Sequence, residues 1–206
     1  MAFDRNAEAD QAYGHKPVLL DECLEALAIR PDGVYLDGTL GRAGHSLEIL
    51  RRLTAGGRLI GLDRDGTALE AARVRLAEYA DRVTLVHSNF SRLAEVLDRA
   101  DRAGTFLLDS VTALLANEMF AGGFDPRAPA RAAEELAAFL DGVRNCVVVS
   151  DYIYADGADY GPRSEAFRRG LAALDRLLAE RCGCVVEVCA GLPIVQKGRL
   201  PGADRK

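Results

Sequence analysis

The stretch Tyr35-Leu36-Asp37-Gly38-Thr39-Leu40-Gly41-Arg42-Ala43-Gly44-His45-Ser46 decides the fold of this chain. A short apolar run enters a turn that holds three glycines, and residues with helical spacing follow. A second apolar run further along ends in acids, Gly61-Leu62-Asp63-Arg64-Asp65. This is the layout of a βαβ nucleotide site, where glycines let the backbone approach a ligand and an acid at the second strand's tip accepts ribose hydroxyls.

The glycine-rich stretch excludes two common phosphate sites. It is neither the Gly-x-x-x-x-Gly-Lys-Ser/Thr loop of nucleoside triphosphatases nor the Gly-x-Gly-x-x-Gly fingerprint of dinucleotide sites. It commits no basic residue to phosphate, so it favours a cofactor without phosphates, and we expect S-adenosylmethionine. We also expect Asp37 to hold the turn by hydrogen bonds and Asp65 to cap the following helix.

Strand and helix patterns alternate along the chain. The predicted strands are Val34–Asp37, Arg58–Asp63, Val83–His87, Thr105–Asp109, Asn145–Ser150 and Val185–Cys189. The predicted helices are Asp21–Ile29, Ser46–Leu53, Gly66–Tyr79 (with Leu69, Ala72, Val74 and Leu76 inward), Ser91–Ala100, Val111–Phe120, Ala130–Leu140 and Ser164–Arg181. Such alternation implies parallel pairing and right-handed crossovers. We therefore predict an α/β three-layer sandwich with a mainly parallel, Rossmann-like sheet.

Length and composition limit the remaining possibilities. A chain of 206 residues suits one α/β domain, and the net charge of −5 argues against tight nucleic-acid binding unless basic residues cluster locally. The five cysteines form no Cys-x-x-Cys pair, so we expect buried core thiols in a reducing cytoplasm and no metal site. Residues 1–14 are polar, so we expect a disordered lead-in without a signal peptide. No run has the length of a membrane span.

Two further runs accompany the glycine-rich loop, His15-Lys16-Pro17-Val18-Leu19-Leu20-Asp21-Glu22 before it and Arg82-Val83-Thr84-Leu85-Val86-His87-Ser88-Asn89-Phe90 after it. From about His15 to about Leu97 the chain resembles the bacterial 16S rRNA cytosine-N4 methyltransferases. The departure is Ala43, where that family usually has glycine. The resemblance implies methyl transfer to a cytosine amine of small-subunit rRNA and leaves the catalytic residue unassigned. It favours as cofactor residues Gly41, Ala43, Gly44, His45, Asp63, Phe90 and Asp109.

The second half resembles a different family. The run from Thr105 to Phe120 and the run Ala190-Gly191-Leu192-Pro193-Ile194-Val195-Gln196-Lys197-Gly198 look like the bifunctional adenosylcobinamide kinase and adenosylcobinamide-phosphate guanylyltransferase. We therefore expect residues 15–103 to form a methyltransferase-like half and 104–206 a kinase-like half, packed into one sheet. The expected product is a truncated methyltransferase of low activity. The alternatives are a kinase-like protein without its P-loop and a non-catalytic fusion product.

Three residues of the second half carry charge that could have a function. Asp109 has three open roles, which are a place near the cofactor, a magnesium contact through water, and structural capping. Arg168 and Lys197 could meet phosphate, but exposed solubilising charge is the preferred interpretation. The sequence assigns no oligomeric state.

Overall fold

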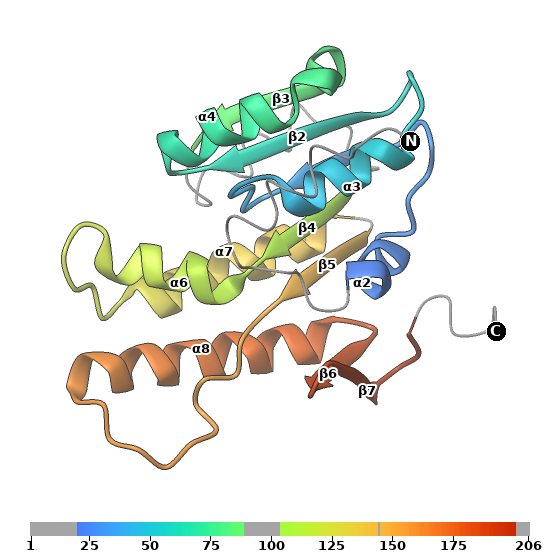
Figure 1. Ribbon diagram of the computed structural model, residues 1–206. Helices are drawn as coiled ribbons and strands as arrows, with labels where there is room; N and C mark the ends of the chain where they lie inside the picture. The colour runs from blue at the N-terminus through green and yellow to red at the C-terminus, as the bar shows by residue number, and fades with distance from the viewer. Residues whose placement is uncertain (1–19, 89–103, 144, 201–206) are drawn as a thin grey trace.

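The computed structural model describes residues 20–88, 104–143 and 145–200, and its centre is a five-stranded parallel sheet (Figure 1). The strands follow the order β3-β2-β1-β4-β5. Their bounds are Val34–Asp37 (β1), Arg58–Asp63 (β2), Val83–His87 (β3), Thr105–Asp109 (β4) and Asn145–Val149 (β5). The predicted α/β class with a mainly parallel, Rossmann-like sheet is confirmed.

Period-two alternation divides the strand residues between the two faces of the sheet. Leu36, Ile60 and Phe106 belong to one buried cluster, whereas Tyr35, Leu59 and Leu107 belong to the other. The first cluster contains residues of α6 (Val111–Phe120), α7 (Ala128–Gly142) and α8 (Pro162–Arg181). The second contains residues of α2 (Leu20–Ala26), α3 (Gly44–Arg52) and α4 (Gly66–Arg75). The result is three layers with the sheet in the middle.

The order of the strands reverses next to β1. The chain runs outward from β1 to β2 and β3, and then returns to the other side of β1 to form β4. In open parallel sheets a ligand lies outside the carboxyl ends of the strands at such a switch point. The ends of β1, β2 and β4 are Asp37, Asp63 and Asp109, so three carboxylates stand at this edge.

Several predicted elements need correction. The helix predicted over Gly66–Tyr79 ends at Arg75, and a 3-10 segment, η1 (Ala77–Arg82), follows it. Val74 is 78% exposed, because the buried side of α4 is set by Leu69 and Ala72. The predicted lead-in 1–14 and the predicted helix Ser91–Ala100 lie outside the described residues. In the part of the chain that the structure covers, no helix is both long and apolar enough to cross a membrane.

One strand of the structure, β7, was not predicted from the sequence. β6 (Val185–Cys189) pairs with β7 (Leu192–Lys197) in an antiparallel hairpin separate from the five-stranded sheet. Positive φ angles at Ala190 (51°) and Gly191 (78°) form the tight turn between them. β7 contains a proline, which weakens the strand pattern in the sequence.

The expected burial of the cysteines is wrong, whereas Lys197 is exposed as expected. The Nζ of Lys197 also donates to the carbonyl oxygens of Ala179 (2.8 Å) and Glu180 (3.0 Å) in the last turn of α8. The cysteines are free thiols, but Cys189 is exposed and the other four are only half-buried. The hydrogen bond from the Cys146 thiol lowers the pKa of Cys182 to about 7.

Arg168 is buried, contrary to the sequence-based expectation of an exposed charge. Its Nη1 donates to the carbonyl oxygen of Ala158 (2.9 Å) and to the Glu165 carboxylate (2.6 Å), and its Nη2 donates to Asp156 Oδ1 (2.7 Å). Nε donates to the carbonyl oxygen of Ile153 (3.3 Å). The guanidinium therefore fastens the loop between β5 and α8 onto α8.

Replacing Arg168 by methionine should destabilise the protein, because loop carbonyls and carboxylates would lose their donor while the apolar stem is retained. We expect a loss of roughly 2–3 kcal/mol in the free energy of unfolding, measured in urea. The matched control is Arg169→Met at the exposed neighbouring position, where the change should stay within about 0.5 kcal/mol. Equal losses in the two variants would contradict the role of Arg168.

Candidate functional site

The loop between β1 and α3 is fastened to the carboxyl ends of two neighbouring strands. The Gly38 N–H donates to the carbonyl oxygen of Leu107 in β4 (2.9 Å), and the Leu40 N–H donates to that of Leu62 in β2 (2.9 Å). The loop residue Thr39 accepts from the Asp109 N–H through Oγ1 (2.7 Å). These contacts hold a bare stretch of backbone at the switch point of the sheet.

The glycines of this loop serve different purposes. A Cβ at Gly38 would meet the Phe106 ring at 2.7 Å, so this glycine is required by packing. Gly41 has a left-handed backbone with φ of +51°. Ala43 at the start of α3 is also left-handed (φ 60°), and its fully buried side chain belongs to the core. A Cβ at Gly44 would meet none of the described residues within 4 Å, so this part of the chain leaves open space there.

Asp37 holds the turn, as the sequence predicted. It is 2% exposed, and its carboxylate accepts from the Ser46 hydroxyl (2.6 Å) and the Thr39 N–H (3.2 Å). The pKa of Asp37 is raised to about 6, mainly by burial and to a smaller extent by the charge of Asp109, while these two hydrogen bonds and His45 oppose the rise.

Asp63 connects β2 to the loop. One carboxylate oxygen accepts from the Gly41 N–H (2.7 Å) and the other from the Asp65 N–H (2.8 Å). A carboxylate has about four acceptor positions, so further donors such as ribose hydroxyls can be accommodated. Asp65 caps α4 as predicted, because its side chain accepts from the Thr67 N–H (2.8 Å).

His45 and Asp109 face each other across the switch point. His45 Nδ1 lies 3.3 Å from Asp109 Oδ2, and the two side chains are 15% and 34% exposed. Capping is excluded as the role of Asp109, because Ser110 caps α6 by accepting from the Ala113 N–H (3.2 Å). In the described ranges no three histidine, cysteine or acidic residues are grouped to hold a metal ion.

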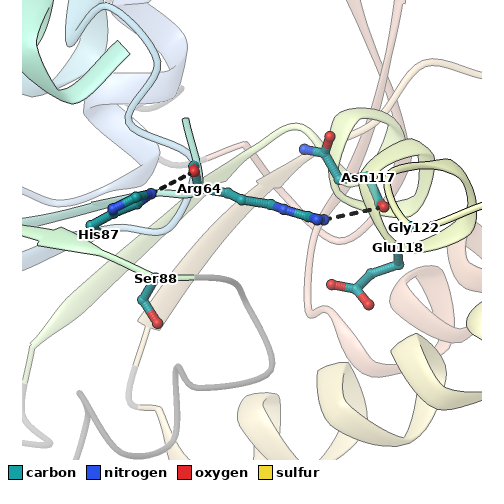
Figure 2. A pocket seen from close by; sticks show the side chains of 6 residues that line it. All are labelled: Arg64, His87, Ser88, Asn117, Glu118 and Gly122. Atoms are coloured by element: carbon teal, nitrogen blue, oxygen red, sulfur yellow. Dashed lines mark hydrogen bonds between the residues drawn. The ribbon is translucent and has the colours of Figure 1, made fainter. Parts of the chain in front are cut away.

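A cavity of about 360 Å³ opens beside Asp63 (Figure 2). Figure 2 shows Arg64 extending from the end of β2 toward α6, where Nη1 donates to the carbonyl oxygen of Asn117 (3.3 Å). The Ser88 N–H donates to the carbonyl oxygen of Asp63 (3.0 Å), which links the cavity to the site. The lining residues are Arg64, His87, Ser88, Asn117, Glu118 and Gly122.

The structure thus brings six of the seven expected cofactor residues to one edge of the sheet, namely Gly41, Ala43, Gly44, His45, Asp63 and Asp109. Phe90 lies outside the described residues. None of the six cavity residues was selected from the sequence. The position of Arg64 after the acid of β2 and that of His87 at the end of β3 were the available signals. The helix α6 was predicted, but nothing in the sequence indicated that its end lines this cavity.

The parallel sheet and its switch point define the class of Rossmann-like α/β folds. An O-methyltransferase from Bacillus cereus, whose structure was determined in complex with SAH, matches 91% of this chain and 83% of its own. The TM-score is 0.54 and the sequence identity 16%, so the likeness concerns the fold.

The sequence pattern of the MraW methylase family matches residues 12–144, and the chain belongs to this family. Ribosomal RNA small subunit methyltransferase H from Lachnospira eligens is 52% identical over 99 residues, which are 47% of this chain and 31% of the relative. The same enzyme from Symbiobacterium thermophilum is 59% identical over 88 residues, which are 43% and 28%. This chain therefore matches less than a third of the length of these relatives.

The family match continues past residue 104, where the sequence was expected to leave the methyltransferases. It includes β4, α6 and α7. None of the comparisons supports the expected resemblance of residues 104–206 to the adenosylcobinamide kinase and guanylyltransferase. The methyltransferase family therefore accounts for most of the described sheet.

The raised pKa of Asp37 makes the stability of the protein depend on pH. The folded state holds the proton of Asp37 more tightly than the unfolded chain does. The contribution of this group to the free energy of unfolding is therefore complete below pH 3.8 and is lost as pH rises through about 6. Asp37→Asn removes the charge, while its Oδ1 can still accept from the Thr39 N–H and its Nδ2 can donate to Ser46 Oγ. Its free energy of unfolding relative to the original protein should rise by up to roughly 3 kcal/mol between about pH 4 and pH 8. A difference that stays constant with pH would contradict this account.

Proposed function

We propose that this protein is an S-adenosylmethionine-dependent methyltransferase of the type that methylates the N4 amine of a cytosine in small-subunit rRNA. The observation that carries the proposal is the loop from Gly38 to His45, which is fastened to two strand ends and leaves open space at Gly44. The family match and the names of the relatives support the reaction and the substrate.

The residues at the carboxyl edge fit the parts of S-adenosylmethionine. The backbone at Gly41, Ala43 and Gly44 would lie along the ligand, and the Asp63 carboxylate would accept from the ribose hydroxyls. The lining of the cavity beside Asp63 includes the cationic Arg64 and the acidic Glu118. This mixed lining suits a neutral polar ring such as adenine. The family resemblance also assigns Phe90, which lies outside the described residues, to the cofactor. When bound, the cofactor supplies a methyl group on a cationic sulfur.

Three carboxylates at this edge favour the cationic end of the cofactor. Asp109, at the tip of β4, would face the amino-acid portion together with His45. The target base has to leave its stack to reach the methyl group. We further propose that residues 15–103 form the cofactor half of the site and that, within residues 104–206, β4 and β5 complete the sheet around it. The protein would act in the cytoplasm, where ribosomal subunits are assembled.

Gly44→Ala tests the cofactor site without harming the fold. A methyl group at this position meets no atom of residues 20–88, 104–143 and 145–200, and alanine in the first turn of α3 should not lower stability. The same methyl would enter the space assigned to the cofactor, so affinity for S-adenosylmethionine in calorimetry should fall about tenfold or more.

The matched control is Gly142→Ala, at the end of α7, where a Cβ also meets no described residue within 4 Å. That variant should bind S-adenosylmethionine as the original protein does. Saturable binding of GTP with no binding of S-adenosylmethionine would disprove the proposed cofactor. Unchanged affinity in Gly44→Ala would disprove the proposed location.

RNA methylation by the 206-residue chain alone should be slow. Affinity for RNA rests largely on clustered Lys and Arg that neutralise phosphates, and the chain carries a net charge of −5. The test measures transfer of a labelled methyl group to small subunits from a strain lacking the native enzyme. The Symbiobacterium thermophilum relative serves as the positive control. Turnover near that of the relative would show that this chain needs no further RNA-binding surface.

A further inference from the structure

Two cysteines from distant parts of the chain meet beside the end of α8. Cys146 is the second residue of β5, and Cys182 is the C-cap residue of α8, where its N–H donates to the carbonyl oxygen of Leu178 (2.8 Å). Leu178 belongs to the buried cluster against which Cys146 packs. The Cys146 thiol donates a hydrogen bond to the Cys182 sulfur, and both side chains are only half-buried. The two sulfur atoms are therefore in contact and within reach of a small molecule.

The surroundings of Cys182 stabilise a thiolate. The hydrogen bond from Cys146 and, to a smaller extent, the charge of Lys197 lower the pKa of Cys182 to about 7, against the opposing effect of burial. Lys197 is held at this place because its Nζ donates to two carbonyl oxygens in the last turn of α8. The same hydrogen bond, together with burial, raises the pKa of Cys146, which therefore keeps its proton. An anionic sulfur beside a protonated one is the arrangement of an attacking and a resolving cysteine.

We propose that Cys182 is an oxidation site for hydrogen peroxide and that Cys146 converts the oxidised sulfur into a disulfide. Cys146 pairs with Phe106 near the amino ends of the parallel strands, whereas the proposed cofactor residues lie at the carboxyl ends. The inference therefore goes beyond the proposed function and does not depend on it. Disulfides formed in a reducing compartment are mostly transient and redox-sensing, and thiols reverse them by exchange.

The oxidation has two balanced steps. The Cys182 thiolate attacks one oxygen of hydrogen peroxide, the O–O bond breaks, hydroxide leaves and a sulfenic acid remains. The Cys146 sulfur then attacks the Cys182 sulfur, the S–O bond breaks, and the departing hydroxide takes the Cys146 proton to form water. Two electrons pass from the two sulfurs to the peroxide. The new bond joins β5, the last strand in the order of the sheet, to the junction between α8 and β6.

Mapping of disulfides after oxidation tests the proposal in the original protein, without any variant. The reduced full chain is kept dilute, treated with hydrogen peroxide near neutral pH, blocked with N-ethylmaleimide and digested for mass spectrometry. The free thiols should fall from five to three, because one disulfide consumes two of them. Fragmentation should identify Cys146 and Cys182 as the linked pair. Dithiothreitol should restore all five thiols.

Variants separate the attacking from the resolving cysteine. Cys182→Ser should form no disulfide under the same treatment. In Cys146→Val the oxidation should stop at a sulfenic acid, which dimedone traps on Cys182. The matched control is Cys184→Ser at a position that is also half-buried, and this variant should form the bond between Cys146 and Cys182 at the rate of the original protein.

Three results in the original protein would overturn the inference. They are oxidation that leaves all five thiols free, a bond from Cys182 to Cys184 or Cys189, and a bond that joins two chains. Among the variants, loss of the bond in Cys184→Ser or a disulfide of Cys146 in Cys182→Ser would overturn it as well.

Discussion

The backbone bonds that fasten the loop from Gly38 to His45 to β2 and β4 are the constraint on which the rest of the site depends. The loop ends β1, donates to carbonyl oxygens of Leu62 and Leu107, and leads directly into α3. Because these bonds are made to strands that the core already holds, the loop needs no ligand to keep its shape. The left-handed conformations of Gly41 and Ala43 turn the chain sharply enough to leave open space at Gly44.

The three carboxylates at this edge differ because their surroundings differ. Asp37 is buried, and burial raises its pKa. Its carboxylate accepts hydrogen bonds from residues of the turn, so its role is structural. Asp63 orders the loop through Gly41 and keeps acceptor positions for a ligand. Asp109 pairs with His45 and is more exposed to solvent than His45 is. Identical side chains at equivalent strand ends therefore serve structure, ribose recognition and cation recognition in the proposed account.

The sequence predicted the framework of the sheet well, because apolar runs bounded by glycine and acids define strand ends locally. β1, β2, β3 and β4 begin and end at the predicted residues. Contacts between distant segments could not be predicted. The burial of Arg168 depends on the path of a loop, the Arg64–Asn117 contact on where α6 lies, and the His45–Asp109 pair on the register of β1 with β4. Likewise, the burial of Ala43 in the core could not be predicted from the glycine-rich pattern.

Backbone amide NMR during titration with S-adenosylhomocysteine tests the central claim most directly. The account predicts that the largest chemical-shift changes fall at Gly41, Gly44 and Asp63 and at the end of β4. Residues of α8 and of the β6–β7 hairpin should change least. Saturable changes concentrated on α8 and the hairpin, with the loop from Gly38 to His45 unaffected, would contradict the claim that this loop forms the cofactor site.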